Sequence, residues 1–160
     1  MKILKIVALS IFLGLVYLGG DLIANNTAFI NTPGPLARLH VYFTLNRAWT
    51  TGGYPLPEVH PRVFYGDPAK LYANITHSVR SFSGWRIESA DSGRLVVRVS
   101  PSFWHHGSRL VVTLSPLRGG LRMDVEASSL SESPDLGADR NYILNLFHEI
   151  GDENAIHPPV

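Results

Sequence analysis

The chain has 160 residues, enough for one domain with a single hydrophobic core and too few for two domains that each bury their own. Its composition, 45% hydrophobic and 17% charged, excludes an intrinsically disordered chain. The 14 basic and 13 acidic residues give a formal net charge of +1, and no run of like charges suggests a nucleic-acid-binding arm.

Residues 1–20 have the pattern of a membrane anchor or a signal segment. Lys2 and Lys5 are followed by an uncharged apolar stretch that reaches Gly20. As a helix, residues 3–20 would cover roughly 27 Å, close to the ~30 Å hydrocarbon core of a bilayer. The segment is therefore just long enough to span.

A signal peptidase would need a small residue at the −3 position of its site. The candidate sites after Gly20 and Ala24 carry Leu18 and Leu22 there. We therefore expect an uncleaved anchor with its lysines on the cytoplasmic side, which leaves the rest of the chain in the periplasm or outside the cell. A cleaved, secreted form is the alternative.

Residues 21–62 are predicted to be an irregular linker or collar. Asn, Thr, Gly and Pro interrupt short apolar pieces, and no helical or alternating period is sustained. The run Leu39–Thr44 is interpreted as a short strand. The proline-containing stretch 51–57 behind it is expected to be extended, because a residue before proline is pushed out of the α region.

The folded domain is predicted over residues 63–151, with a disordered tail at 152–160. Asp67 and Pro68 indicate a capped helix start, and alternating apolar residues indicate strands separated by glycine turns. The expected elements are a short strand at 63–65, a helix from 68 to about 83, strands at 85–88, 94–100, 109–115 and 121–126, and a helix from about Asp139 to Ile150. They predict an α+β fold: an antiparallel four- to five-stranded sheet with two helices on one face, preceded by the N-terminal transmembrane or signal helix.

The charges are sorted along the chain. Residues 21–125 hold 11 basic and 6 acidic side chains, a net of +5, whereas the tail from Glu126 onward holds Arg140 against 7 acidic side chains, a net of −6. All cations after residue 20 except Lys70 are arginines, which form planar two-pronged contacts. We expect the arginine-rich body to pair with the acidic tail.

Signatures of metal and cofactor sites are weak. His105 and His106 are adjacent and would point to opposite faces of a strand, and His148 has no second histidine four residues away. The chain has no cysteine, which excludes disulfides, thiol catalysis and cysteine-bound zinc. No serine elbow or phosphate-binding glycine loop is present, so we expect no metal and no cofactor.

Two local features remain as candidates. Asp135 and Asp139, with Glu132 nearby, could share a helix face and raise one another's pKa; the alternative is that they serve a turn and a helix cap. The stretch Pro101–His106 holds two large aromatic residues, and it is expected to cover the sheet or to dip into a membrane interface.

Three stretches resemble the family known as domain of unknown function 1499, small bacterial and plastid proteins without an assigned activity. They are 37–46; 61–72 together with 84–87; and 135–143, which begins Asp-Leu-Gly. The resemblance implies an envelope location and carries over Ser129, Asp135, Leu136 and Gly137. The sequence departs from the family pattern at 126–132, where relatives have arginines, and at Asp139, where they have Asn.

We expect a membrane-anchored envelope domain that binds a partner or small ligand, without catalysis, through the loop before the last helix and the exposed sheet face. The candidate binding residues are Ser129, Asp135, Gly137, Asp139 and Arg140. One alternative is a hydrolase or transferase with Asp135, Asp139 or His148 as general base, which requires these three to converge. Another is a structural protein whose arginines dock on anionic lipid headgroups. No nucleic-acid partner is expected.

Overall fold

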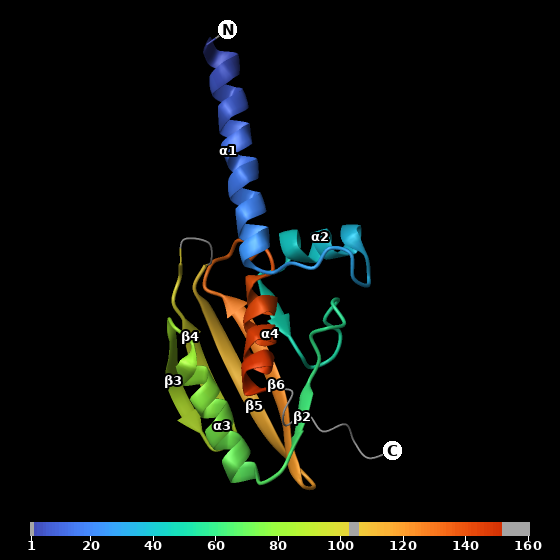
Figure 1. Cartoon of the computed structure of the whole chain (residues 1–160), viewed down its shortest axis with the longest axis vertical. Coiled ribbons are helices and arrows are strands. Elements are labelled where there is room, and N and C mark those ends of the chain that lie inside the picture. Colours follow the sequence, from blue (N-terminus) through green and yellow to red (C-terminus); the bar gives the residue numbers. More distant parts are fainter. Residues whose placement is uncertain (1, 103–105, 152–160) are drawn as a thin grey trace.

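The computed structural model describes residues 2–102 and 106–151, and in it one antiparallel sheet carries helices while a long N-terminal helix projects from one end (Figure 1). The predicted α+β fold with an N-terminal apolar helix is confirmed. The aromatic tip of the 101–106 loop and the predicted tail lie outside the described residues. The elements are α1 (Lys2–Ala24), α2 (Pro35–Thr44), β1 (Arg47–Trp49), β2 (Arg62–Tyr65), α3 (Pro68–Ser81), β3 (Trp85–Asp91), β4 (Arg94–Val99), β5 (Ser108–Leu117), β6 (Gly120–Ser129) and α4 (Ala138–Ile150).

The sheet has six strands in the order β1-β6-β5-β4-β3, with β2 also paired to β6. Strands β3 to β6 form the meander that the alternating sequence predicted. Because β5 occupies one edge of β6 along its whole length, β1 and β2 share the other edge, one at each end. The pairing with β2 requires glycine at position 120, since a Cβ there would overlap the carbonyl oxygen of Phe64.

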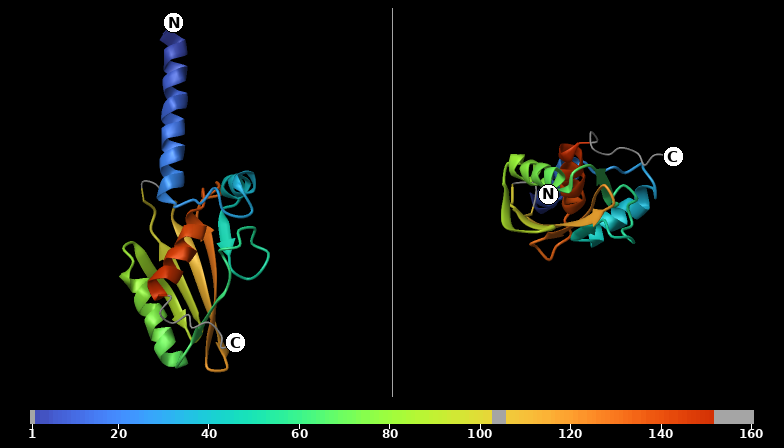
Figure 2. Two further views of the ribbon diagram at one scale, coloured as in Figure 1. Left: turned by 45° about the vertical axis from the view of Figure 1, so that its right-hand side comes forward. Right: turned by 90° about the horizontal axis from the view of Figure 1, so that it is seen from below.

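The core lies between the sheet and the pair α3 and α4, which contact each other and the strands; the views in Figure 2 show both helices over one broad face of the sheet. Helix α3 begins as predicted: Asp67 Oδ1 accepts a hydrogen bond from the backbone N–H of Ala69 at 2.9 Å. Alternate strand residues meet apolar residues of the helices. The buried residues include Leu95, Val97, Leu110, Val112, Met123 and Val125 from the strands and Ile75, Val79, Ile143 and Leu146 from the helices.

Helix α1 stands clear of the domain for most of its length (Figure 1). Its side chains are exposed from Ile3 to Tyr17. Over Ile3–Ala24 it is long and apolar enough to cross a membrane or to serve as a signal sequence. It continues four residues beyond the predicted end at Gly20, and these last residues reach the domain.

The interpretation of Leu39–Thr44 as a strand is wrong, because these residues form the second half of α2. Arg38, Val41 and Tyr42 lie three and four residues apart, so the helix places them on one face, and all three are buried. The β-branched and aromatic content of the run favours a strand locally, and burial of this face overrides that preference. Val41 and Tyr42 form a small second core with Leu56.

Candidate functional site

The residue after α1, Asn25, joins that helix to the start of α4. Its side-chain Nδ2 donates to the backbone oxygen of Leu136 and to Asp21 Oδ1, both at 3.2 Å, with the backbone oxygen of Asp135 at 3.4 Å. Asn25 is completely buried. We call this region the polar joint; it comprises Asp21, Asn25, Arg38, Glu58, Asp135, Asp139 and Arg140.

Glu58 connects two helices within the polar joint. Its Oε1 accepts hydrogen bonds from Arg38 Nη1 at 2.8 Å and Arg140 Nε at 2.7 Å, and its Oε2 accepts one from Arg38 Nη2 at 2.8 Å. Arg38 belongs to α2 and Arg140 to α4, and both guanidinium groups are buried. Burial alone would raise the pKa of Glu58, but the hydrogen bonds from the two arginines outweigh it and lower that pKa to about 2.

Asp135 and Asp139 form a buried carboxyl pair at the start of α4. Asp135 Oδ1 accepts from the backbone N–H of Gly137 at 3.0 Å, and its Oδ2 accepts from that of Asp139 at 2.8 Å. The side chain of Asp135 therefore binds N–H groups of the turn and first residues of α4, while the N-cap position itself is Gly137. Burial, followed by the charge of Asp135, raises the pKa of Asp139 to about 8, and burial raises the pKa of Asp135 as well. Burial therefore disfavours ionising both carboxyls of the pair at once.

The predicted binding residues do lie at one end of the domain, but their side chains are used inside it. Asp135, Asp139 and Arg140 are 7%, 0% and 4% exposed. Gly137 has a φ of 89°, which residues with side chains rarely adopt, and a Cβ there would lie 3.0 Å from Thr27 Cγ2, so a substitution would be strained. This packing supports a structural role for these residues.

Ser129 ends β6 and bonds locally: its N–H donates to the backbone oxygen of Asn46 at 2.9 Å, and its hydroxyl accepts from the N–H of Ser131 at 3.2 Å.

His148 stands nine residues after Asp139 on α4, roughly 13 Å along the helix axis. The three proposed general bases therefore do not converge. Among the described residues, no cluster of three His, Cys, Asp or Glu side chains could hold a metal ion.

Four arginines line up across the sheet face opposite α3 and α4. The strand register pairs Arg86 with Arg98, Arg98 with Arg109, Arg109 with Ser128, and Ser128 with Arg47. All four arginines are exposed, and their strand neighbours on alternate positions point into the core. We call Arg47, Arg86, Arg98 and Arg109 the arginine row.

Like charges directly opposite one another destabilise a sheet. Glu88 offsets part of this repulsion, with its carboxylate 3.3 Å from Arg98 Nε and 3.7 Å from Arg109 Nε. Glu126 is two residues before Ser128 on β6, so it lies on the same sheet face as the four arginines, and it pairs with Trp49 of β1. Adjacent strands are ~4.8 Å apart, so two neighbouring guanidinium forks can hold one phosphate or carboxylate between them. The arginine row has the chemistry of an anion-binding surface.

The arginine row lies close to the polar joint. Arg47 follows Asn46, which accepts the hydrogen bond from Ser129, and the N–H of Asp135 donates to the backbone oxygen of Leu45 at 3.2 Å. The row is therefore at the end of the domain from which α1 projects.

The described ion pairs of the arginine-rich body use carboxylates of the body itself. Arg38 pairs with Glu58, Arg98 and Arg109 with Glu88, and Arg122 with Asp124. The predicted pairing of the body with the acidic tail is not found among them.

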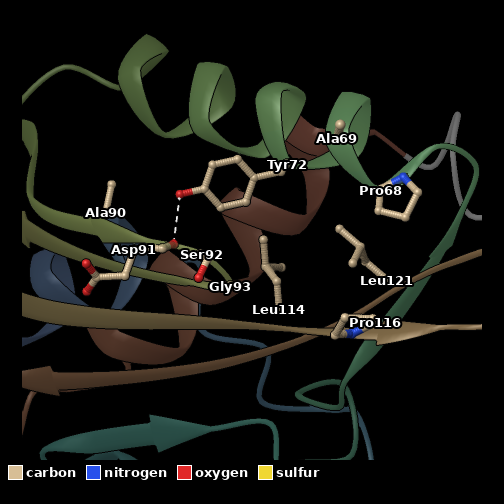
Figure 3. Close-up of a pocket in the computed structure, with 10 residues that line it drawn as sticks. All are labelled: Pro68, Ala69, Tyr72, Ala90, Asp91, Ser92, Gly93, Leu114, Pro116 and Leu121. Carbon is tan, nitrogen blue, oxygen red and sulfur yellow. Dashed lines mark hydrogen bonds between the residues drawn. The ribbon is translucent and has the colours of Figure 1, made fainter.

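A hollow of about 710 Å³ opens between α3 and the β3–β4 hairpin, at the end of the sheet remote from the polar joint (Figure 3). Leu114 and Leu121 are buried beneath it, while Tyr72 donates from its hydroxyl to the backbone oxygen of Asp91 at 3.1 Å on its rim. An apolar floor with a few polar rim groups is typical of small-ligand sites.

The arginine row was missed because it depends on strand register. The signal present in the sequence is that Arg98 and Arg109 stand at similar distances on either side of the 101–107 loop. A hairpin closed symmetrically about that loop puts the two residues opposite each other. Comparisons with protein families, with curated proteins and with solved structures gave no match to this chain, so the family resemblance stays a prediction.

Proposed function

We propose that this protein is a membrane-anchored domain that binds a ligand carrying a phosphate or carboxylate group through the arginine row. The observation that supports it is the register, which sets exposed guanidinium groups side by side on rigid strands. Like charges in register oppose strand pairing, so a bound anion would relieve repulsion that Glu88 offsets only in part. The length and apolar composition of α1 support the anchoring. The lysines at the start of α1 favour an orientation with residues 21–160 outside the cytoplasm.

The anion has two sources within reach. A soluble molecule can approach the exposed sheet face from the aqueous side. A lipid headgroup can approach from the bilayer, because the row lies at the end of the domain that carries α1. Both sources offer the same planar, charge-assisted contacts to arginine.

Pyrophosphate is a suitable probe, measured by calorimetry with the full chain in nanodiscs of zwitterionic lipid. We expect binding that weakens with added salt. Arg98→Gln should weaken it roughly tenfold or more, the range for losing a hydrogen bond to a charged group. Arg94→Gln is the matched control: it lies on the same strand and the same face, four residues from Arg98.

Anionic lipid in the nanodisc separates the two sources. If headgroups occupy the row, replacing zwitterionic by anionic lipid should abolish pyrophosphate binding in the wild type. If the ligand is soluble, the affinity should change little. Equal losses in both arginine variants, or no pyrophosphate binding in zwitterionic nanodiscs, would contradict the proposal.

A further inference from the structure

Helix α2 has an apolar face that the domain does not cover. Its inward face, with Arg38 and Tyr42, is buried, while Leu36 is 84% exposed and Phe43 is 40% exposed. These two residues are seven apart, so they lie on one side of the helix, opposite Arg38. A group of exposed large apolar side chains on one surface often marks a site that contacts a protein or a membrane.

This face lies at the end of the domain where α1 meets it. The end of α1 and the start of α4 are tied together by Asn25, and α2 is tied to the same place by Arg38 and Glu58. Figures 1 and 2 show α2 beside the lower end of α1 and lying across its direction. Ile30, in the connection between the two helices, is 90% exposed.

The same stretch of chain exposes no formal charge. Between Asp21 and Arg47 the only residue with a formal charge is Arg38, which is buried and paired with Glu58. The exposed remainder is apolar or neutral, with Asn31, Thr32 and two prolines beside Ile30. A surface of this kind matches the boundary between lipid headgroups and acyl chains, where an amphipathic helix lies flat with its apolar side chains inserted.

We propose that α2 is a second membrane contact: Ile30, Leu36 and Phe43 enter the interfacial layer of the bilayer that α1 spans. The occupant of this face is lipid because α1, continuous in sequence with the segment, carries the chain into the bilayer at this end of the domain. The inference rests on the proposed anchoring. It adds that the domain is held flat against the membrane by α2.

The absence of cysteine makes the test direct. Single cysteines are introduced into the full chain by Leu36→Cys, Phe43→Cys, Leu13→Cys in the middle of α1, and Lys70→Cys at the start of α3, the end of the domain remote from α1. Each is labelled with an environment-sensitive fluorophore and reconstituted in vesicles. Quenching by lipids with a nitroxide high on the acyl chain is compared with quenching by lipids with a nitroxide near the chain end.

We expect labels at 36 and 43 to be quenched by the shallow nitroxide more than by the deep one, the label at 13 by the deep nitroxide, and the label at 70 by neither. Quenching at 13 without quenching at 36 and 43 would overturn the inference and leave the anchor intact. Loss of quenching at 13 would overturn the anchor and the inference together. Protection of 36 and 43 from aqueous iodide without lipid quenching would indicate that a second copy of the chain covers this face and would overturn the inference.

Discussion

Glu58→Gln tests the central contact of the polar joint. The substitution keeps the shape of the side chain but removes the only carboxylate within residues 2–102 and 106–151 that is shown bonding to Arg38 and Arg140, whose side chains are 1% and 5% exposed. Removing one partner of a buried ion pair costs about 3–5 kcal/mol. Since the Glu58 side chain is 24% exposed, we expect the lower end, about 3 kcal/mol. For a chain of this length, that corresponds to a fall in Tm of roughly 6–12 °C.

The assay is thermal and denaturant unfolding of the detergent-solubilised full chain, followed by near-ultraviolet circular dichroism. Glu88→Gln is the matched control, because Glu88 also lies between two arginines, but these are about half exposed. The control should cost less than about 1 kcal/mol. Equal losses in the two variants would refute the reasoning.

Acid gives a second check on the same contact. The pKa of Glu58 is lowered to about 2 in the fold, so the stability it contributes is present above about pH 4.5 and lost as the pH falls through 2. The difference between wild type and Glu58→Gln should therefore shrink over that window. A constant difference would show that the charge of Glu58 is not the source of the effect.

Three further substitutions test other contacts. Asp139→Asn removes a carboxyl whose pKa is raised to about 8, so the wild type should lose stability as pH rises from about 4 to 8 while the variant does not; parallel denaturation curves would contradict the raised pKa. Gly120→Ala should drive a Cβ into the Phe64 carbonyl and speed amide exchange in β2; unchanged protection would contradict the close approach. Asp67→Ala should cost about 1 kcal/mol by removing the cap of α3, more than the exposed Ser83→Ala does in the same thermal unfolding assay.

The elements found from sequence are those specified by neighbours in the chain. Asp67 and Pro68 mark the start of α3 because capping and proline preference act within one turn. The strands β5 and β6 alternate between core and solvent, and the short glycine turn between them leaves little choice of partner. Local chemistry was sufficient for these parts of the fold.

The parts that were missed depend on residues far apart in the chain. Helix α2 forms where its sequence favours a strand, because one face of the helix is buried against distant residues. Arg38 on that face binds Glu58, twenty residues later, and Glu58 also binds Arg140. The alignment of Arg86 with Arg98 depends on a β-bulge between Ile87 and Ser89, which no local pattern marks. Asp135 and Asp139 were identified, but their burial depends on distant segments: Asn25 and Leu45 both bond to the backbone of Asp135.

The position of Asn25 bears on how the chain matures. The hydrogen bonds from its side chain to the backbone oxygens of Asp135 and Leu136 come after Ala24, so peptidase cleavage after that residue would release the anchor and leave these bonds with the domain. The new α-ammonium group would be on Asn25, whose side chain donates to the backbone oxygen of Asp135, the partner of Asp139 in the buried carboxyl pair. A positive charge there favours their ionised forms. Cleavage after Ala24 would thus lower the pKa values of Asp135 and Asp139 inside the domain.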